Sequence, residues 1–225
     1  MANLTITNYD NAGVAIGDNK YVESVLAFAG ADDFAAGTLL GKNKIAAGTA
    51  SAGTNTGNGT VSAFVVVNSK ELAKVGTYVF KLTAALVGDL IDPDGVIVAK
   101  SIALSDGTAT AIDSAGISFT ITDGATPFVA GDTFNLPVAL GNGKYVVYSS
   151  IGIGGAEFPC AVLTYSVSNS TSGDVAIRPL IAGDVRKEKL VIDSGASLTS
   201  FEIDELKKNG IYAIPVNELY AQDNQ

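Results

Sequence analysis

Runs rich in valine, isoleucine, threonine, tyrosine and phenylalanine recur along the chain, separated at short intervals by glycine, serine, asparagine and aspartate. This pattern is typical of many short strands joined by turns. It predicts a mainly β protein of the α+β class. The clearest predicted strands are residues 61–67, 77–84, 96–101, 117–121, 133–138, 144–149, 161–167 and 175–181.

One helix is predicted, near the C-terminal end of the chain. Thr199 can cap its N-terminus, and Glu202 three residues later can complete a capping box. Gly210 suits the left-handed position just after the last turn. Ile203 and Leu206 share an apolar face, so we expect the helix to pack that face against a sheet.

The sequence Asp92-Pro93-Asp94-Gly95 predicts a tight turn between two strands. Proline supplies a fixed φ and glycine a positive one. The two aspartates also suggest a calcium loop. That loop needs further oxygen ligands and a distal glutamate, whereas Val96 and the residues after it return to a strand pattern. The turn is the favoured interpretation.

A domain insertion is indicated by the change in composition at residues 48–60, which carry no charge and almost no bulky side chain. This stretch is interpreted as a linker or long loop. The β-rich residues that follow form a self-contained unit, closed by a second glycine cluster at residues 141–143. We therefore expect an inserted, β-sandwich-like domain over residues 43–141.

Composition narrows the functional classes. Hydrophobic residues make up 47% and charged residues 16% of the chain, a balance typical of a folded protein. Histidine is absent, which excludes His-containing triads and zinc sites. The carboxylates of Asp32 and Asp33 lie in a Gly/Ala-rich turn, where a solvated role is favoured over acid–base catalysis. We expect no enzyme, no cofactor and no metal site.

Charge and hydropathy limit the partners. The net charge of −9 opposes nucleic-acid binding, which depends on Lys and Arg neutralising phosphates. No apolar run reaches the roughly 20 residues that a membrane-spanning helix needs. The first residues lack the basic and apolar regions of a secretory signal, so we expect synthesis in the cytoplasm and use without export by that route. Cys160 lies in an apolar context and predicts a buried, inert thiol.

The N-terminal residues 1–25 alternate in part between apolar and polar side chains. An extended segment of this kind can add a strand to the exposed sheet edge of a partner. The alternative is that residues 4–7 form the first strand of the protein's own core, and the sequence leaves both open. The candidate binding residues of this predicted arm are Leu4, Thr5, Ile6, Thr7, Val14 and Ile16.

A family resemblance emerges when the chain is followed across the insertion. The order of segments 36–42, 143–148, 160–167 and 173–185, then the helix, a Gly210-Ile211 pair and a last short strand, resembles the head decoration proteins of lambda-like tailed bacteriophages. Residues 92–95, 117–125 and 128–134 are similar to an insertion carried by longer members of that family. Residues 165–168 depart from the family, where this stretch is often acidic.

The resemblance implies a structural virion protein without enzymatic activity. Such a protein binds the major capsid protein on the outer surface of the head as a homotrimer at local three-fold axes. There it stabilises the expanded capsid against DNA pressure. The expected organisation is an arm at 1–25, a discontinuous core at 26–42 and 142–216, the insertion at 43–141 and a tail at 217–225.

Two further roles stay open at this point. The first is a surface adhesin or fibre-type binding domain, which a low pI and threonine-rich short strands also suit. Apart from this alternative, the inserted domain of the decoration protein is expected to allow weak contact with a host surface. The second is a capsid contact through Arg178 and the basic run 186–189, although such runs are more often solvated turns.

Overall fold

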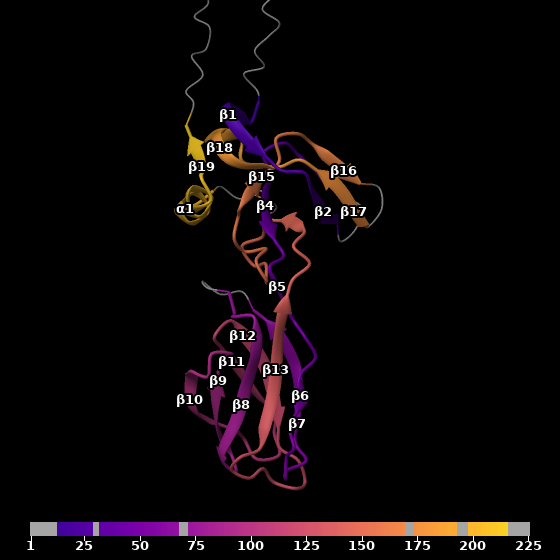
Figure 1. The fold of residues 1–225 in the computed structure, drawn as a ribbon, viewed down its shortest axis with the longest axis vertical. Helices are drawn as coiled ribbons and strands as arrows, with labels where there is room; N and C mark the ends of the chain where they lie inside the picture. Colours follow the sequence, from indigo (N-terminus) through magenta and orange to yellow (C-terminus); the bar gives the residue numbers. More distant parts are fainter. Residues whose placement is uncertain (1–12, 29–31, 68–71, 170–172, 193–197, 216–225) are drawn as a thin grey trace, which may run out of the picture. The chain divides into compact units, whose positions relative to one another are not determined.

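The computed structural model describes residues 13–28, 32–67, 72–169, 173–192 and 198–215. The fold is mostly β, at 52% strand and 6% helix, with several sheets, one of them curled into a half-barrel (Figure 1). The mainly β prediction is confirmed. The chain divides into two compact units. Unit 1 comprises Met1–Lys42, Lys144–Ser150 and Ala156–Gln225, and unit 2 comprises Asn43–Gly143 and Ile151–Gly155.

Unit 1 is built around an eight-stranded sheet in the order β1-β18-β15-β4-β14-β2-β17, with β19 also beside β18. Strands β3 and β16 form a separate two-stranded ribbon. The strands are β1 (Ala15–Tyr21), β2 (Ser24–Phe28), β3 (Asp32–Phe34), β4 (Leu39–Lys42), β14 (Tyr145–Val147), β15 (Ala161–Val162), β16 (Val167–Asn169), β17 (Gly173–Ile177), β18 (Leu180–Arg186) and β19 (Ile211–Ile214).

Both faces of the unit 1 sheet are covered. Leu39 and Leu40 are neighbours in β4 and are each fully buried, yet they belong to different hydrophobic clusters. Because successive side chains of a strand point to opposite faces, one cluster lies on each side of the sheet. Leu39 belongs to the cluster that contains Leu206 of the helix, and Leu40 belongs to the cluster that contains Leu26.

The insertion point lies between two neighbouring strands. β4 ends at Lys42, and β14, which resumes unit 1 after the insertion, pairs with β4 with Tyr145 opposite Lys42. The two chain ends that receive unit 2 are therefore close together, which is the geometry that tolerates an inserted domain.

Unit 2 is a sandwich of two sheets. One has the order β10-β9-β8-β13-β5 with β6 also beside β13, and the other has the order β11-β12-β7. Phe80 of β8 and Phe119 of β12 meet edge to face between them, with ring centroids 5.6 Å apart. The strands are β5 (Ile45–Ala47), β6 (Ser51–Ala52), β7 (Thr60–Val66), β8 (Gly76–Ala84), β9 (Val87–Ile91), β10 (Ile97–Ala103), β11 (Thr110–Ser114), β12 (Ile117–Thr122) and β13 (Thr133–Leu140).

Of the two interpretations of the glycine-rich stretch 48–60, a linker or a long loop, the structure confirms the loop, which lies within unit 2. Its β6 pairs with β13, and the N–H of Gly48 donates to the carbonyl of Pro137 at 2.7 Å. Gly59 lies against the ring of Phe128, so close that an added Cβ would approach it to 2.1 Å. The stretch is a loop of unit 2 held against β13 and Phe128.

The turn at residues 92–95 is present between β9 and β10. The N–H of Gly95 donates to the carbonyl of Asp92 at 2.9 Å, and Asp92 Oδ1 accepts the N–H groups of Asp94 and Val96. Lys74 Nζ lies 2.6 Å from a carboxylate oxygen of Asp92 and of Asp94. A lysine therefore lies between the two carboxylates that suggested a calcium loop.

Asp132 ties the loop of unit 2 to the start of β13. Its side chain is buried and accepts the N–H groups of Thr56 at 2.8 Å, Gly57 at 3.0 Å and Val129 at 3.1 Å. Burial raises the pKa of this carboxyl, but the three N–H donors outweigh burial and leave the pKa below its usual value. Asp132 is therefore a charged acceptor that organises the loop.

Asp132→Asn is expected to destabilise unit 2 by about 1–3 kcal/mol at pH 7, because an amide N–H₂ then faces backbone donors. The folded-state pKa of Asp132 is depressed, so its stabilisation is complete above the unfolded pKa of roughly 4 and is lost as pH falls through the folded value. The difference between wild type and variant should shrink from pH 7 to pH 3 in urea melts. Asp106→Asn, at an exposed aspartate of the same unit, is the control; equal melts of wild type and Asp132→Asn at pH 7 would contradict this role.

Candidate functional site

The structure places only part of the predicted arm. Leu4, Thr5, Ile6 and Thr7 lie outside the described residues. Whether they dock on a partner or form a strand of the protein's own core stays a prediction.

The later part of the predicted arm belongs to unit 1 itself. Val14 is 3% exposed in the cluster of Leu206, and its carbonyl accepts the N–H of Arg186 at 2.8 Å. Ile16 is half-buried in β1, opposite Asp184 of β18. This corrects the prediction for Val14, because a side chain enclosed by its own core offers nothing to a partner.

The two described ends of unit 1 lie on either side of one residue of β18. Ala15, at the start of β1, pairs antiparallel with Val185, and Ala213 of β19 pairs parallel with the same residue. Figure 1 shows β1, β18 and β19 together at one end of this sheet. The chain before residue 13 and the chain after residue 215 therefore both continue from the neighbourhood of Val185.

Basic and apolar side chains gather where β18 ends. Arg186 closes β18, and the short 3-10 helix η1 (Lys187–Lys189) follows directly. On β19, Tyr212 is 49% and Ile214 is 38% exposed, and these residues pair with Asp184 and Arg186. Glu188 of η1 is exposed as well, so three basic residues and one acidic residue occupy positions 186–189. In a chain of net charge −9, this locally basic and apolar surface favours an acidic partner. We call it the β18 end, and it consists of Arg186, Lys187, Lys189, Tyr212 and Ile214.

A buried carboxylate, that of Glu202, joins the helix α1 (Ser200–Lys208) to its N-cap residue and to Tyr148. Thr199 is the N-cap and accepts the N–H of Phe201 at 3.2 Å, while Glu202 reaches back to the N–H of Thr199 at 2.8 Å. The hydroxyl of Tyr148 donates to Glu202 at 2.6 Å. Burial and the adjacent carboxylate raise the pKa of Tyr148, so this hydroxyl stays protonated and remains a donor.

The helix ends as the sequence suggests, and its end fixes β19. The backbone N–H of Asn209 donates to carbonyls of the last turn, and Gly210 follows with a φ of 78°. The carbonyl of Gly210 accepts the N–H of Gly183 at 2.9 Å, which connects the helix end to β18. The capping residues thus position the strand that carries Tyr212 and Ile214.

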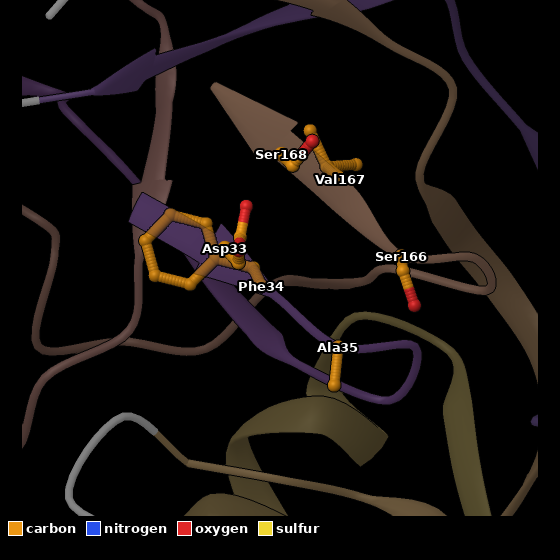
Figure 2. A pocket seen from close by; sticks show the side chains of 6 residues that line it. All are labelled: Asp33, Phe34, Ala35, Ser166, Val167 and Ser168. Carbon is orange, nitrogen blue, oxygen red and sulfur yellow. The ribbon is translucent and has the colours of Figure 1, made fainter. Parts of the chain in front are cut away.

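A hollow of about 460 Å³ lies over the ribbon of β3 and β16 (Figure 2). Its polar groups are the carboxylate of Asp33 and the hydroxyls of Ser166 and Ser168, with Ser168 opposite Asp33 across the ribbon. The ring of Phe34 packs against Phe28, with centroids 5.1 Å apart. The lining residues are Asp33, Phe34, Ala35, Ser166, Val167 and Ser168.

The serine hydroxyls of the hollow can form hydrogen bonds, and the carboxylate of Asp33 adds a negative charge. Its serines have no imidazole beside them, since the chain contains no histidine. Across the described ranges, no group of three or more histidine, cysteine, aspartate or glutamate side chains is placed to hold a metal ion. No helix in that part of the chain is long and apolar enough to span a membrane.

The sequence did not reveal three of the residues that organise these features. Tyr148 meets Glu202 across 54 positions of sequence, and Lys74 meets Asp92 across 18. The hydroxyl of Tyr165 accepts the N–H of Arg178 at 2.7 Å. No local pattern marks such partners, because each depends on how distant strands pair.

Comparison with known proteins gives little further information. No protein-family model and no curated protein matches the chain. Similar solved structures include FlgL of Xanthomonas campestris in two crystal forms, each at a TM-score of 0.34, with 23% and 24% sequence identity. These matches cover 47% and 49% of this chain and 33% and 32% of the FlgL chain, so the match spans about a third of FlgL. A likeness this weak carries no argument about function.

Proposed function

We propose that this chain is a decoration protein of a tailed-bacteriophage head. It binds the major capsid protein on the outer surface as a homotrimer at local three-fold axes and stabilises the expanded shell. The observation that carries the proposal is the order of segments in unit 1. A β-rich core is interrupted between β4 and β14 by most of unit 2, and again by the short segment Ile151–Gly155. It ends in α1, the Gly210-Ile211 pair and β19. That order resembles the lambda-like decoration proteins.

The β18 end supplies a surface suited to the capsid contact. The residues before 13 continue from its edge, so an arm and a folded surface can engage one partner together. Lys187 is exposed and directly follows Arg186, which pairs with Ile214, while Tyr212 and Ile214 are themselves partly exposed. This combination fits an acidic partner with some apolar area.

A trimer explains how a small contact can hold a head together. Each copy contributes one modest contact, and after the first has formed the others become intramolecular. Such tethering raises overall affinity by roughly 10²-fold or more without any new contact. A clamp that joins several capsid subunits then resists the outward pressure of packaged DNA.

The arm and the β18 end are tested separately by binding to expanded heads that lack decoration protein. Removal of residues 1–12 is expected to abolish co-sedimentation with the heads. The double substitution Lys187→Glu with Lys189→Glu is expected to weaken the affinity for the heads by on the order of tenfold. The matched controls are removal of residues 216–225 and Lys207→Glu with Lys208→Glu at the end of α1. Both controls should bind as the full chain does.

Either of two results would count against the proposal. In the first, the full chain fails to bind heads assembled from the capsid protein of its own phage. In the second, the arm deletion binds as tightly as the full chain. The first result would favour an adhesin or fibre-type domain, which should bind cells or cell-wall material instead.

A further inference from the structure

The edge of the larger sheet of unit 2 exposes consecutive apolar side chains. β10 is the last strand of that sheet, and β9 is its only partner among the described strands. Val96 is 56%, Ile97 49% and Val98 38% exposed. Edge strands are usually protected by charge or covered, because an apolar edge invites another chain. Three adjacent exposed β-branched residues therefore mark a contact surface.

This apolar surface continues onto the outer face of the same sheet. Ile97 pairs with Ile91 of β9, and Ile91 pairs with Val79 of β8. Ile91 and Val79 are half-buried, and they alternate with Leu90 and Phe80, which are fully buried in the sandwich core. A sheet face turned to water normally carries polar residues. We define the β10 patch as Val79, Ile91, Val96, Ile97 and Val98.

The β10 patch is aliphatic, which points to an apolar protein surface as its partner. Tyr78, Phe80, Phe119, Phe128 and Phe134 of unit 2 are all buried in the sandwich core. None of these rings forms part of the patch, so no exposed aromatic platform is available there for stacking. β-branched side chains on an edge strand pack well against the same kind of strand.

The charges that flank β10 on one copy of the chain are complementary to those that flank β10 on a second copy. Asp94 lies three residues before Ile97 and Lys100 three residues after it. The side chain of Asp94 is 66% exposed although it pairs with Lys74, and Lys100 is exposed and takes part in no ion pair among the described residues. Two copies of β10 placed antiparallel about Ile97 would bring each Val96 opposite the other Val98. Each Lys100 would then lie toward the turn that carries the other Asp94.

We propose that the β10 patch binds the β10 patch of a second copy of this chain around a two-fold axis at Ile97. This gives the inserted unit a contact of its own and does not depend on where unit 1 binds. Two-fold contacts use one surface on both copies, so the surface must be self-complementary, as this one is in charge and in apolar side chains.

The contact is weak in free solution and strong only at high local concentration. The β10–β9 pairing shifts register twice, and Ser101 has a φ of 55°, so a second β10 cannot continue a long regular ladder. A few side chains per copy also bury far less than the roughly 800 Å² per partner of a stable interface. Copies held side by side on a repeating surface would meet at much higher effective concentration.

Disulfide trapping of the full chain tests the two-fold axis directly. Residues opposite each other in an antiparallel pair place their Cβ atoms close enough for a disulfide. Ile97→Cys is expected to form a covalent dimer under mild oxidation, much faster than Val65→Cys. Val65 is the matched control, because it is 45% exposed on β7 of the other sheet. Wild type, with Cys160 alone, reports the background.

Charge reversal in the Ile97→Cys background tests the antiparallel register. Lys100→Glu or Asp94→Lys alone should slow dimer formation through repulsion, and the two together should restore it. Far-UV circular dichroism checks that each variant is folded. Equal trapping of Ile97→Cys and Val65→Cys would overturn the proposal, as would a double charge reversal that traps no faster than the single ones. Neither result bears on capsid binding, since no heads are present.

Discussion

Phe119→Ala is expected to lower the free energy of unfolding of unit 2 by about 3–5 kcal/mol, as for other fully buried phenylalanines. The Phe119 ring is 0% exposed and meets Phe80 edge to face at 5.6 Å, where the two sheets of the sandwich join. Its removal leaves a cavity that neither sheet can close. Scanning calorimetry should show one transition shifted to lower temperature and a second unchanged, because unit 1 has separate hydrophobic clusters.

Val65→Ala in the same small sheet is the control for this prediction. Val65 is 45% exposed, so its truncation should cost less than about 0.5 kcal/mol. Phe119→Ala should also bind phage heads as the wild type does below its melting temperature, because the proposed contact lies on unit 1. A uniform shift of both calorimetric transitions would show that the two units do not unfold independently.

Glu202→Ala is expected to destabilise unit 1 by about 2–4 kcal/mol, the second-largest effect. The substitution removes the capping box of α1 and leaves the hydroxyl of Tyr148, a residue that is 1% exposed, without its acceptor. An orphaned buried hydroxyl carries the full cost of its desolvation. Because α1 leads into β19, exchange of the amide protons in β19 should also accelerate.

Asp204→Ala and Tyr148→Phe distinguish the contribution of the Tyr148–Glu202 hydrogen bond from the general effect of a substitution in the helix. Asp204 is exposed on the same helix, so its loss should change stability little. Tyr148→Phe keeps the ring and removes the donor, and a double-mutant cycle with Glu202→Ala measures the coupling between the two side chains. A coupling near zero would mean that the 2.6 Å hydrogen bond contributes nothing to the position of α1.

The helix and several strands could be predicted because their signals are local. The capping residues Thr199, Glu202 and Gly210 act within the helix they delimit, so the sequence alone placed it. In unit 2, the alternation of buried residues in β8 and β12 matches the period of a strand with one face in the core. These strands lie within one or two residues of their predicted bounds.

Predictions failed where tertiary contacts override a local pattern. The predicted strand 161–167 is divided between β15 and β16. Between them, the fully buried Leu163 donates its N–H to the carbonyl of Thr38, which lies outside any regular strand. The predicted strand 175–181 is broken between Ile177 and Leu180. Pro179 within it lacks an N–H and disfavours a continuous ladder, a signal that was available in the sequence.

The extent of unit 2 and the surfaces of unit 1 depend on contacts between distant segments. Unit 2 begins at residue 43 and includes Ile151–Gly155 as well, beyond the expected range 43–141. The carbonyl of Gly154 accepts the N–H groups of Lys44 and Ile45. No change in composition along the sequence predicts this contact. The hollow at Asp33 and the β18 end likewise arise from strand pairing across the chain.

The most direct measurement is the number of copies that bind to expanded, undecorated heads at saturation, followed by the heat resistance of those heads. A trimer at every local three-fold axis predicts saturation near one copy per capsid subunit, with heads that survive heating better than undecorated ones. Absent or unsaturable binding, or saturation at a number unrelated to the three-fold axes with no gain in resistance, would contradict the account.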